Sequence, residues 1–214
     1  MKKILIIDDH DIMRFALQTL VNTSQTTHVV ETQPSLALGL ASIKRLEPDL
    51  VVCDMSLGDS RGLDTVRAVT QAQSPRPVLM LSMHDEMIYA ELALGIGAKG
   101  YLMKERAQEF LLEAIEKVLE GNVWVSPQVN TFLLNTVMKR KSSESSLQPA
   151  KLVGHLSQRE LEVLEKIGAG KTTKEIAFDF GLSPRTVDIH RANIKKKLAL
   201  RNSAEVLAFA LSRT

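Results

Sequence analysis

Five short apolar runs alternate with helical patterns through the first half of the chain, and this alternation limits the fold more than any other feature. The runs predict strands at residues 2–9, 28–33, 49–55, 76–82 and 99–104. The helical patterns follow them at 12–22, 35–46, 62–72, 86–97 and 107–120. Because strands that are apolar throughout belong to sheets buried on both faces, we expect a five-stranded, doubly wound parallel α/β sheet.

Polar side chains stand at the ends of four of these strands, where such a sheet collects its functional groups. They are Asp8 and Asp9, Asp54, Ser82 and Lys104. Crowded carboxylates repel one another unless a cation is present, and hard oxygen ligands suit Mg²⁺. A carboxylate can also attack phosphorus and form an aspartyl phosphate, whose oxygens a lysine and a hydroxyl would stabilise. The pattern therefore predicts a phosphoryl-accepting site that uses Mg²⁺.

The segments around these residues resemble the receiver domain of bacterial two-component response regulators, which has the CheY-like fold. They are IIDDH (6–10), VVCDMSLGDSRG (51–62), LMLSMHDE (79–86) and GYLMK (100–104). The resemblance covers about residues 1–122 and implies that a sensor histidine kinase phosphorylates Asp54. It further implies that Asp9, Asp54 and the Ser56 carbonyl bind Mg²⁺, with support from Asp8. Lys104 would stabilise the phosphate, and Ser82 and Tyr101 would form a switch.

Two positions depart from the family's pattern. Receiver domains usually carry proline four residues after the phosphoacceptor, but the loop-like Ser-Leu-Gly-Asp-Ser has Gly58 there, and glycine restrains a loop less. Met83 is bulkier than the residue that commonly follows the switch hydroxyl, and could crowd the switch. His10 is assigned to the surface with metal ligation as the alternative, and no chemistry is assigned to His84.

An enzyme of another class could also form an aspartyl phosphate. Phosphatases of the haloacid dehalogenase type carry a second aspartate, their general acid and base, two residues after the nucleophile, and Ser56 occupies that place here. We therefore expect a phosphoacceptor with slow autodephosphorylation at most, and not an enzyme. A nucleotide-binding fold is disfavoured, because no Gly-x-Gly-x-x-Gly or P-loop follows the first strand.

Clear helix-start signals mark the last sixty residues. Two capping boxes begin helices, at Ser157–Glu160 and Thr172–Glu175, and a cap followed by proline begins a third at Ser183. The helices expected from these and later signals are 158–168, a short helix ended by Gly181, 184–198, and 204–212 with Asn202 or Ser203 as its cap. Two helices joined by a tight turn form a helix-turn-helix, whose second helix enters the major groove of DNA.

Residues 156–198 resemble the LuxR-type helix-turn-helix of the NarL/FixJ subfamily. The match runs from Leu-Ser-x-Arg-Glu through Lys-Glu-Ile-Ala to Thr-Val-x-x-His-x-x-Asn-Ile. The helical spacing of Val187, Ile194 and Leu198 predicts the face that packs in the core. The resemblance implies DNA contacts from Lys174, Thr186, Asp188, Ile189, His190, Arg191, Ala192 and Lys195. Of these, Asp188, Ile189 and Ala192 would face bases, although Arg191 is an alternative contact for guanine.

The distribution of charge supports a division of the chain. Residues 1–125 hold 12 Lys/Arg against 17 Asp/Glu, whereas residues 151–214 hold 12 against 7. Between them, a helix is predicted at 127–139, and KRKSSESSLQPAK (139–151) has the composition of a flexible linker. We expect a receiver at 1–122, a helix and linker at 123–151, and a small all-α helix-turn-helix domain at 152–214.

These features together predict a DNA-binding transcription regulator controlled by phosphorylation. The expected partners are a sensor histidine kinase and double-stranded DNA with two-fold or repeated half-sites, bound by a homodimer when phosphorylated. The departures at Gly58 and Met83 leave an alternative open, a phosphorylation-independent DNA-binding regulator with a degenerate receiver used for protein interaction. The single Cys53 fits a reducing compartment and no apolar run is long enough to span a membrane, so we expect a cytoplasmic protein without a membrane partner.

Overall fold

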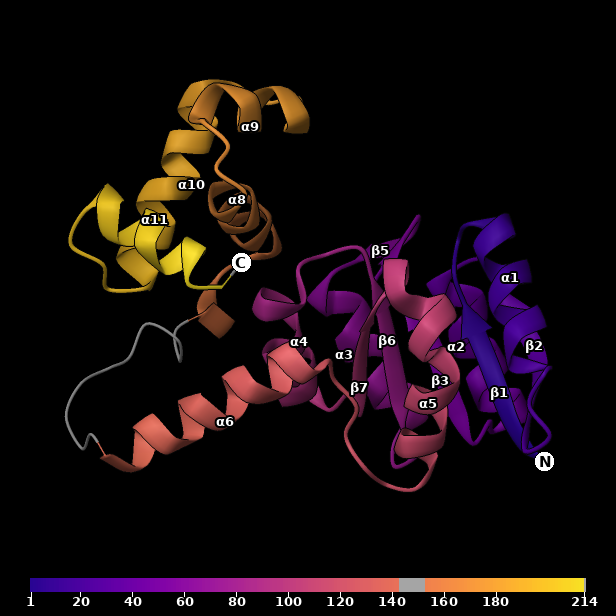
Figure 1. Cartoon of the computed structure of the whole chain (residues 1–214). Helices are drawn as coiled ribbons and strands as arrows, with labels where there is room; N and C mark the ends of the chain where they lie inside the picture. The colour runs from indigo at the N-terminus through magenta and orange to yellow at the C-terminus, as the bar shows by residue number, and fades with distance from the viewer. Residues whose placement is uncertain (143–152, 214) are drawn as a thin grey trace. The chain divides into compact units, whose positions relative to one another are not determined.

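The computed structural model of the chain describes residues 1–142 and 153–213 (Figure 1). The chain divides into two compact units, Met1–Thr131 and Phe132–Thr214. Within the described part of the chain, no helix has both the length and the apolar character needed to cross a membrane.

A five-stranded parallel sheet forms the centre of the first unit, with the strand order β2-β1-β3-β6-β7. Its strands are β1 (Lys2–Ile7), β2 (Thr27–Gln33), β3 (Leu50–Asp54), β6 (Val78–Ser82) and β7 (Gly100–Met103). Every residue of β3 and β6 is buried, which explains why these segments are apolar without alternation. The predicted sheet is confirmed, except that β1 ends two residues before Asp9.

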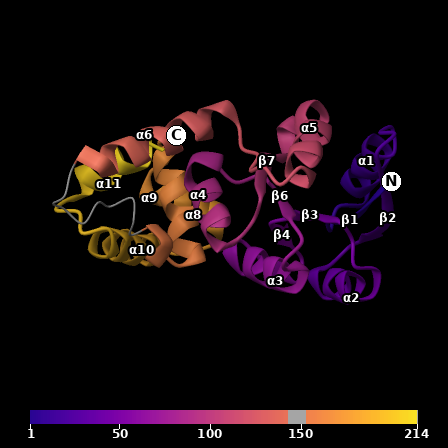
Figure 2. The same ribbon diagram turned by 90° about the horizontal axis from the view of Figure 1, so that it is seen from below.

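Five helices cover the two faces of this sheet (Figure 2). They are α1 (Asp11–Val21), α2 (Leu36–Leu46), α3 (Leu63–Gln73), α4 (Glu86–Ile96) and α5 (Ala107–Leu119). Helix α1 packs beside α5 on one face, and α3 packs between α2 and α4 on the other. The doubly wound α/β architecture is therefore the one that the alternating pattern predicts.

The segment after β3 differs from the prediction. The sequence pattern treats it as a loop, but it forms a two-stranded antiparallel hairpin of β4 (Ser56–Leu57) and β5 (Ser60–Arg61). The Leu57 side chain is buried, and the Gly62 N–H donates to the Met55 carbonyl at 2.8 Å. Strands of two residues are too short to produce a periodic signal, so sequence patterning does not detect them.

The chain remains attached to the first unit after α5. Trp124 forms an isolated parallel bridge with Gly100 of β7, at the edge of the sheet. Two residues later, the Ser126 hydroxyl donates to Glu86 Oε1 in the first turn of α4 at 2.6 Å. The first compact unit thus continues past residue 122, the boundary expected from the sequence, and Thr131 is its last residue.

Helix α6 (Pro127–Ser142) begins where the sequence predicts. The Ser126 hydroxyl accepts a hydrogen bond from the Val129 N–H at 3.2 Å and so caps the helix. The helix continues to residue 142 and includes the first residues of the predicted linker, which is a correction to the expected end at 139. The rest of that linker, 143–151, lies outside the described residues.

After α6, the described residues of the second unit form a short 3₁₀ turn, η2 (Val153–His155), and four helices: α8 (Gln158–Gly168), α9 (Thr173–Phe180), α10 (Pro184–Lys197) and α11 (Ser203–Leu211). Both predicted capping boxes form their reciprocal hydrogen bonds, and Asn202 rather than Ser203 caps α11. Gly181 ends α9 in the left-handed region at φ 62°, which permits the tight turn into α10. Helices α9 and α10 form the predicted helix-turn-helix.

Helix α10 packs against α8, α9 and α11 through one apolar face. Val187, Ile194 and Leu198 are completely buried, as their spacing predicts. Glu160 adds a polar connection to this packing, because its Oε2 accepts from the Ser157 N–H and from Lys197 Nζ, each at 2.7 Å. Burial favours a raised pKa for Glu160, but the bonds from Lys197 and Ser157 outweigh burial and hold the pKa below its usual value.

A carboxylate whose pKa is lowered by folding stabilises the protein above its unfolded-state pKa, here near 4.5, and this stabilisation is lost as the pH falls through the folded-state value. We predict that Glu160→Gln lowers the free energy of unfolding of the second unit by about 1–3 kcal/mol near neutral pH. Calorimetric scans of the full chain should show this difference shrinking below pH 4.5. Glu162→Gln, on the same helix, is the control, and a difference that is independent of pH would contradict the ionic role of Glu160.

Candidate functional site

A buried ion-paired cluster lies at the carboxyl edge of the sheet. Lys104 begins the short 3₁₀ turn η1 (Lys104–Arg106) after β7, and its Nζ lies 2.6 Å from Asp8 Oδ2 and 2.7 Å from Asp54 Oδ2. All three side chains are buried, and Asp54 is only 2% exposed. The sheet order explains the cluster, because β1 and β3 are neighbours and the long lysine side chain reaches them from β7.

The electrostatics of the cluster depend on the lysine. Burial raises the pKa of Asp54 above its usual value, although the hydrogen bonds from Lys104 and from the Ser56 N–H (3.0 Å to Oδ1) act in the opposite direction. Burial would lower the pKa of Lys104, but its hydrogen bonds to Asp54 and Asp8 outweigh burial, so its pKa is raised. The site therefore holds a charged lysine against carboxylates that are costly to bury alone.

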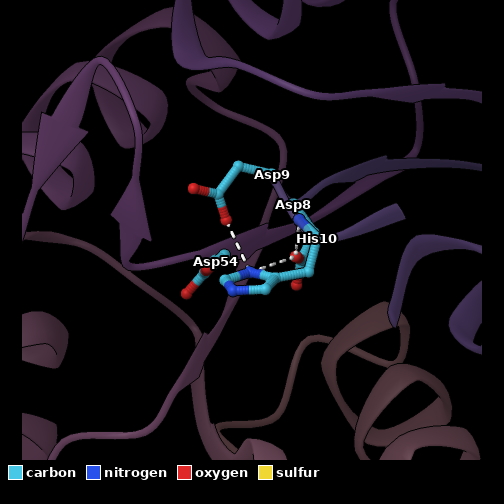
Figure 3. Close-up of side chains that lie close together, drawn as sticks. All are labelled: Asp8, Asp9, His10 and Asp54. Carbon is cyan, nitrogen blue, oxygen red and sulfur yellow. Dashed lines mark hydrogen bonds and ion pairs between the residues drawn. The ribbon is translucent and has the colours of Figure 1, made fainter. Parts of the chain in front are cut away.

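Beside this cluster lies an acidic group that could hold a metal ion, formed by the side chains of Asp8, Asp9, His10 and Asp54 (Figure 3). Asp8, Asp9, His10 and Asp54 each offer one ligand atom, and these atoms lie within 4.8 Å of one another. The His10 ring is 72% exposed and its Nδ1 lies 2.7 Å from Asp9 Oδ1, so it is a surface side chain that also borders the acidic group. The buried carboxylates of Asp8 and Asp54 and the partly exposed carboxylate of Asp9 form an oxygen donor set that suits Mg²⁺.

The predicted switch residues meet at the loop after β6. The buried Ser82 hydroxyl accepts from the His84 N–H at 2.9 Å, and the buried Tyr101 donates its hydroxyl to the His84 carbonyl at 2.9 Å. The His84 ring Nε2 lies 3.2 Å from Ser56 Oγ, beyond the end of β3. His84 thus connects Ser82, Tyr101 and Ser56, a role that sequence reasoning missed because spacing along the chain does not show which loops are adjacent.

The two departures from the family's pattern have limited local effects. Met83 is 61% exposed, so the expectation that it crowds the switch is wrong. Gly58 has no positive φ, and a Cβ there would meet only Asp9 Oδ2 within 4 Å, at 3.8 Å. The backbone at Gly58 therefore does not require glycine.

The residues expected to contact DNA lie mainly on α10, away from its buried face. Asp188, Ile189, Ala192 and, on α9, Lys174 are exposed, whereas Thr186, His190, Arg191 and Lys195 are half-buried. Thr173 of α9 connects two of them, because its Oγ1 lies 3.4 Å from Asp188 Oδ1 and accepts from an Arg191 guanidinium nitrogen at 3.5 Å. Sequence reasoning did not assign this role to Thr173, which has no signature apart from its place in a helix N-terminus.

Comparison with known proteins assigns a family to each unit. Residues 4–116 match the response regulator receiver domain, and residues 154–210 match the bacterial regulatory proteins of the luxR family. The chain belongs to the LuxR-type response regulators. As a member of this family it is a transcription regulator controlled by phosphorylation and not a classical enzyme. These matches confirm the family and the fold class that the sequence predicts.

Relatives extend the match over the whole chain. The oxygen regulatory proteins NreC of Staphylococcus carnosus and Staphylococcus haemolyticus are 31% and 32% identical over 215 residues, with 99% of this chain and 97% of each relative covered. The structure of RcsB from Salmonella enterica serovar Typhimurium, bound to a promoter with the phosphomimetic BeF₃⁻, shares the fold. It has a TM-score of 0.60 at 20% identity, covering 99% of this chain and 98% of that chain. A LuxR-family response regulator from Aurantimonas sp. SI85-9A1 has a TM-score of 0.58 at 26% identity, covering 64% of this chain and 98% of that one.

Removing the lysine should destabilise the first unit in a pH-dependent way. We predict that Lys104→Met lowers the free energy of unfolding by about 3–5 kcal/mol in metal-free buffer near pH 7.5, because two buried carboxylates lose their cation. Urea unfolding should show a smaller loss near pH 5, since Asp54, whose pKa is already raised, then takes up a proton. Lys117→Met, at an exposed lysine, is the control. A loss that is equal at both pH values would point to packing rather than charge.

Proposed function

We propose that Asp54 is the phosphoacceptor of this regulator and that a sensor histidine kinase is its phosphodonor. The observation that carries this proposal is the buried Lys104–Asp8–Asp54 cluster, which borders the acidic group at the carboxyl edge of the sheet. An oxygen of the Asp54 carboxylate attacks phosphorus and the phosphorus–nitrogen bond of the donor breaks. The electron pair leaves with the donor imidazole, which then takes up a proton.

The surrounding side chains match the charge that develops in this transfer. Asp9, Asp54 and the Ser56 carbonyl would hold Mg²⁺, with Asp8 in support, and the ion would offset the negative charge of the phosphoryl oxygens. Lys104 supplies a fixed positive charge beside Asp54. Ser56 stands where a phosphatase would carry its general acid, so the aspartyl phosphate is lost only by slow autodephosphorylation.

Ser82 and Tyr101 respond to the phosphate. The Ser82 hydroxyl keeps its own hydrogen to donate to a phosphoryl oxygen, while it accepts from the His84 N–H. Tyr101 holds the carbonyl of the same His84 from the interior of the unit. Phosphorylation favours one of two arrangements of this loop and shifts an existing equilibrium, rather than creating a new conformation.

The output is binding of double-stranded DNA by α10 and the start of α9. Asp188, Ile189 and Ala192 face bases, or Arg191 contacts guanine in their place. The remaining contacts, to phosphate or the edge of the groove, come from Lys174, Thr186, His190, Arg191 and Lys195. A homodimer formed on phosphorylation would place two such helices on two-fold or repeated half-sites and gain affinity from their linkage.

The sequence leaves open a phosphorylation-independent regulator with a degenerate receiver, because of Gly58 and Met83. Two observations disfavour it. The acidic group and Lys104 are all present at the sheet edge, and Met83 is directed to solvent. Phosphorylation control is therefore the preferred function of the receiver.

We predict that a small-molecule phosphodonor with Mg²⁺ labels the natural chain and not Asp54→Asn. The reason is that the Asp54 carboxylate is proposed to attack phosphorus beside Lys104, and asparagine offers no carboxylate in its place. DNA affinity should rise on labelling of the natural chain only. Asp64→Asn, which changes an exposed carboxylate of α3, is the control and should be labelled normally. Unlabelled natural protein that binds DNA equally well would support the degenerate receiver.

We also predict that Lys195→Met weakens binding to all DNA sequences by a similar factor, because it removes a phosphate contact. The slope of log affinity against log salt concentration should fall by about 0.9. Lys166→Met removes an equal charge from α8 and should leave the slope unchanged. Fluorescence anisotropy with one duplex of fixed sequence and one of mixed sequence measures both quantities. A loss confined to the fixed sequence would instead assign Lys195 to base recognition.

A further inference from the structure

The loop that follows Asp54 contributes to the proposed site, although it lacks the proline that usually restrains it. Its Ser56 N–H donates to Asp54 Oδ1 at 3.0 Å, and Ser56 also supplies the proposed carbonyl ligand. Gly58 and the next residue, Asp59, form the two-residue turn of the β4–β5 hairpin, between the paired residues Leu57 and Ser60. Isolated two-stranded hairpins are marginally stable, so this loop needs another anchor to hold Ser56 in place.

Asp59 provides such an anchor at the N-terminus of α2. Its Oδ1 accepts from the Leu36 N–H at 2.9 Å, and its Oδ2 accepts from the Ala37 N–H at 3.0 Å. These two N–H groups belong to the first turn of the helix, where backbone donors have no partner within the helix and favour negative charge. Burial favours a raised pKa for Asp59, but the two N–H donors outweigh burial and lower it, so Asp59 accepts these bonds as a carboxylate.

Helix α2 in turn packs against β1, the strand that ends just before Asp8 and Asp9. A Cβ at Gly39 would lie 2.4 Å from Ile7 Cδ1, so the helix approaches β1 as closely as only glycine allows. Ile7 directly precedes Asp8 and Asp9. Contacts therefore run without a break from the turn at Asp59, through α2, to the end of β1, and they connect the two sides of the acidic group.

We propose that Asp59 is a positioning residue for phosphorylation of Asp54, and that its carboxylate restrains the acceptor loop in place of the missing proline. This inference rests on the proposed function of Asp54. The Asp59 side chain restrains the loop through its contacts with α2, whereas a proline ring would restrain it through the backbone. The hairpin stays in register with Asp54 because it is tied at its turn to α2 and at its base to Met55 through Gly62.

The test uses the full chain with Asp59→Ala and a matched control, Ser35→Ala. Both variants remove a cap of α2, since the Ser35 hydroxyl accepts from the Leu38 N–H at 3.3 Å, but only Asp59 connects the helix to the loop. Gly58→Pro is added to the natural chain and to Asp59→Ala. Proline suits this position because it is the first residue of the turn, its φ is not positive, and Leu57 before it is extended.

Three quantities are measured: amide hydrogen exchange of residues 55–62 without metal, the Mg²⁺ dissociation constant by calorimetry, and the labelling rate at limiting Mg²⁺. Asp59→Ala should speed exchange in the loop, and should weaken Mg²⁺ binding and slow labelling by roughly tenfold, as expected when a group that orients a metal ligand is lost. Ser35→Ala should change none of the three. Gly58→Pro should restore most of the loss in Asp59→Ala and add little to the natural chain.

Equal values for Asp59→Ala and the natural chain, or equal losses in Asp59→Ala and Ser35→Ala, would overturn the inference. Failure of the proposed function gives a different result. The natural chain would then bind Mg²⁺ with a dependence on Asp59 but remain unlabelled, and the anchor would stand without its role in phosphorylation. A natural chain that binds no Mg²⁺ would overturn both proposals.

Discussion

The pairing of one buried lysine with two buried carboxylates is the interaction on which the rest of the first unit depends. Lys104 Nζ lies within 2.7 Å of both Asp8 and Asp54, and none of the three side chains has substantial contact with water. Buried charges are tolerated only when they are paired, so strands β1, β3 and β7 must end at the same edge in a fixed register. The same pairing places the Asp54 carboxylate beside a positive charge, which suits its proposed role as acceptor of a phosphoryl group.

The loops around this cluster join it to more distant parts of the unit. His84 contacts Ser82, Tyr101 and Ser56 through its N–H, its carbonyl and its ring, respectively. Two residues further on, Glu86 accepts a hydrogen bond from Ser126, which caps α6. The loop after β6 is therefore adjacent both to the cluster that contains Asp54 and to α6, so a rearrangement of this loop would affect both. On the other side of the cluster, the hairpin is tied to α2.

The second unit is organised by local interactions to a much greater extent. Helices α8 and α9 begin at capping boxes, α10 begins at a capped proline and α11 at the Asn202 cap, and Gly181 sets the turn of the helix-turn-helix. The ion pair between Glu160 and Lys197 is a longer-range exception, since it joins the cap of α8 to the end of α10. The buried face of α10 fixes which side chains remain accessible, and these include the residues proposed to contact DNA.

The sequence by itself determined the fold class, the helix caps and the set of polar residues at the strand ends. Each of these depends on short-range chemistry: apolar runs, residues three apart that share a cap, and carboxylates that directly follow a strand. Only the tertiary structure decided the contacts of His84 with Ser56 and of Asp59 with Leu36, because they join residues 28 and 23 positions apart. It also decided that residues 56–61 form a hairpin, since strands of two residues have no period of their own. Such contacts depend on which loops the sheet order brings together, and the spacing of residues along the chain does not predict that order.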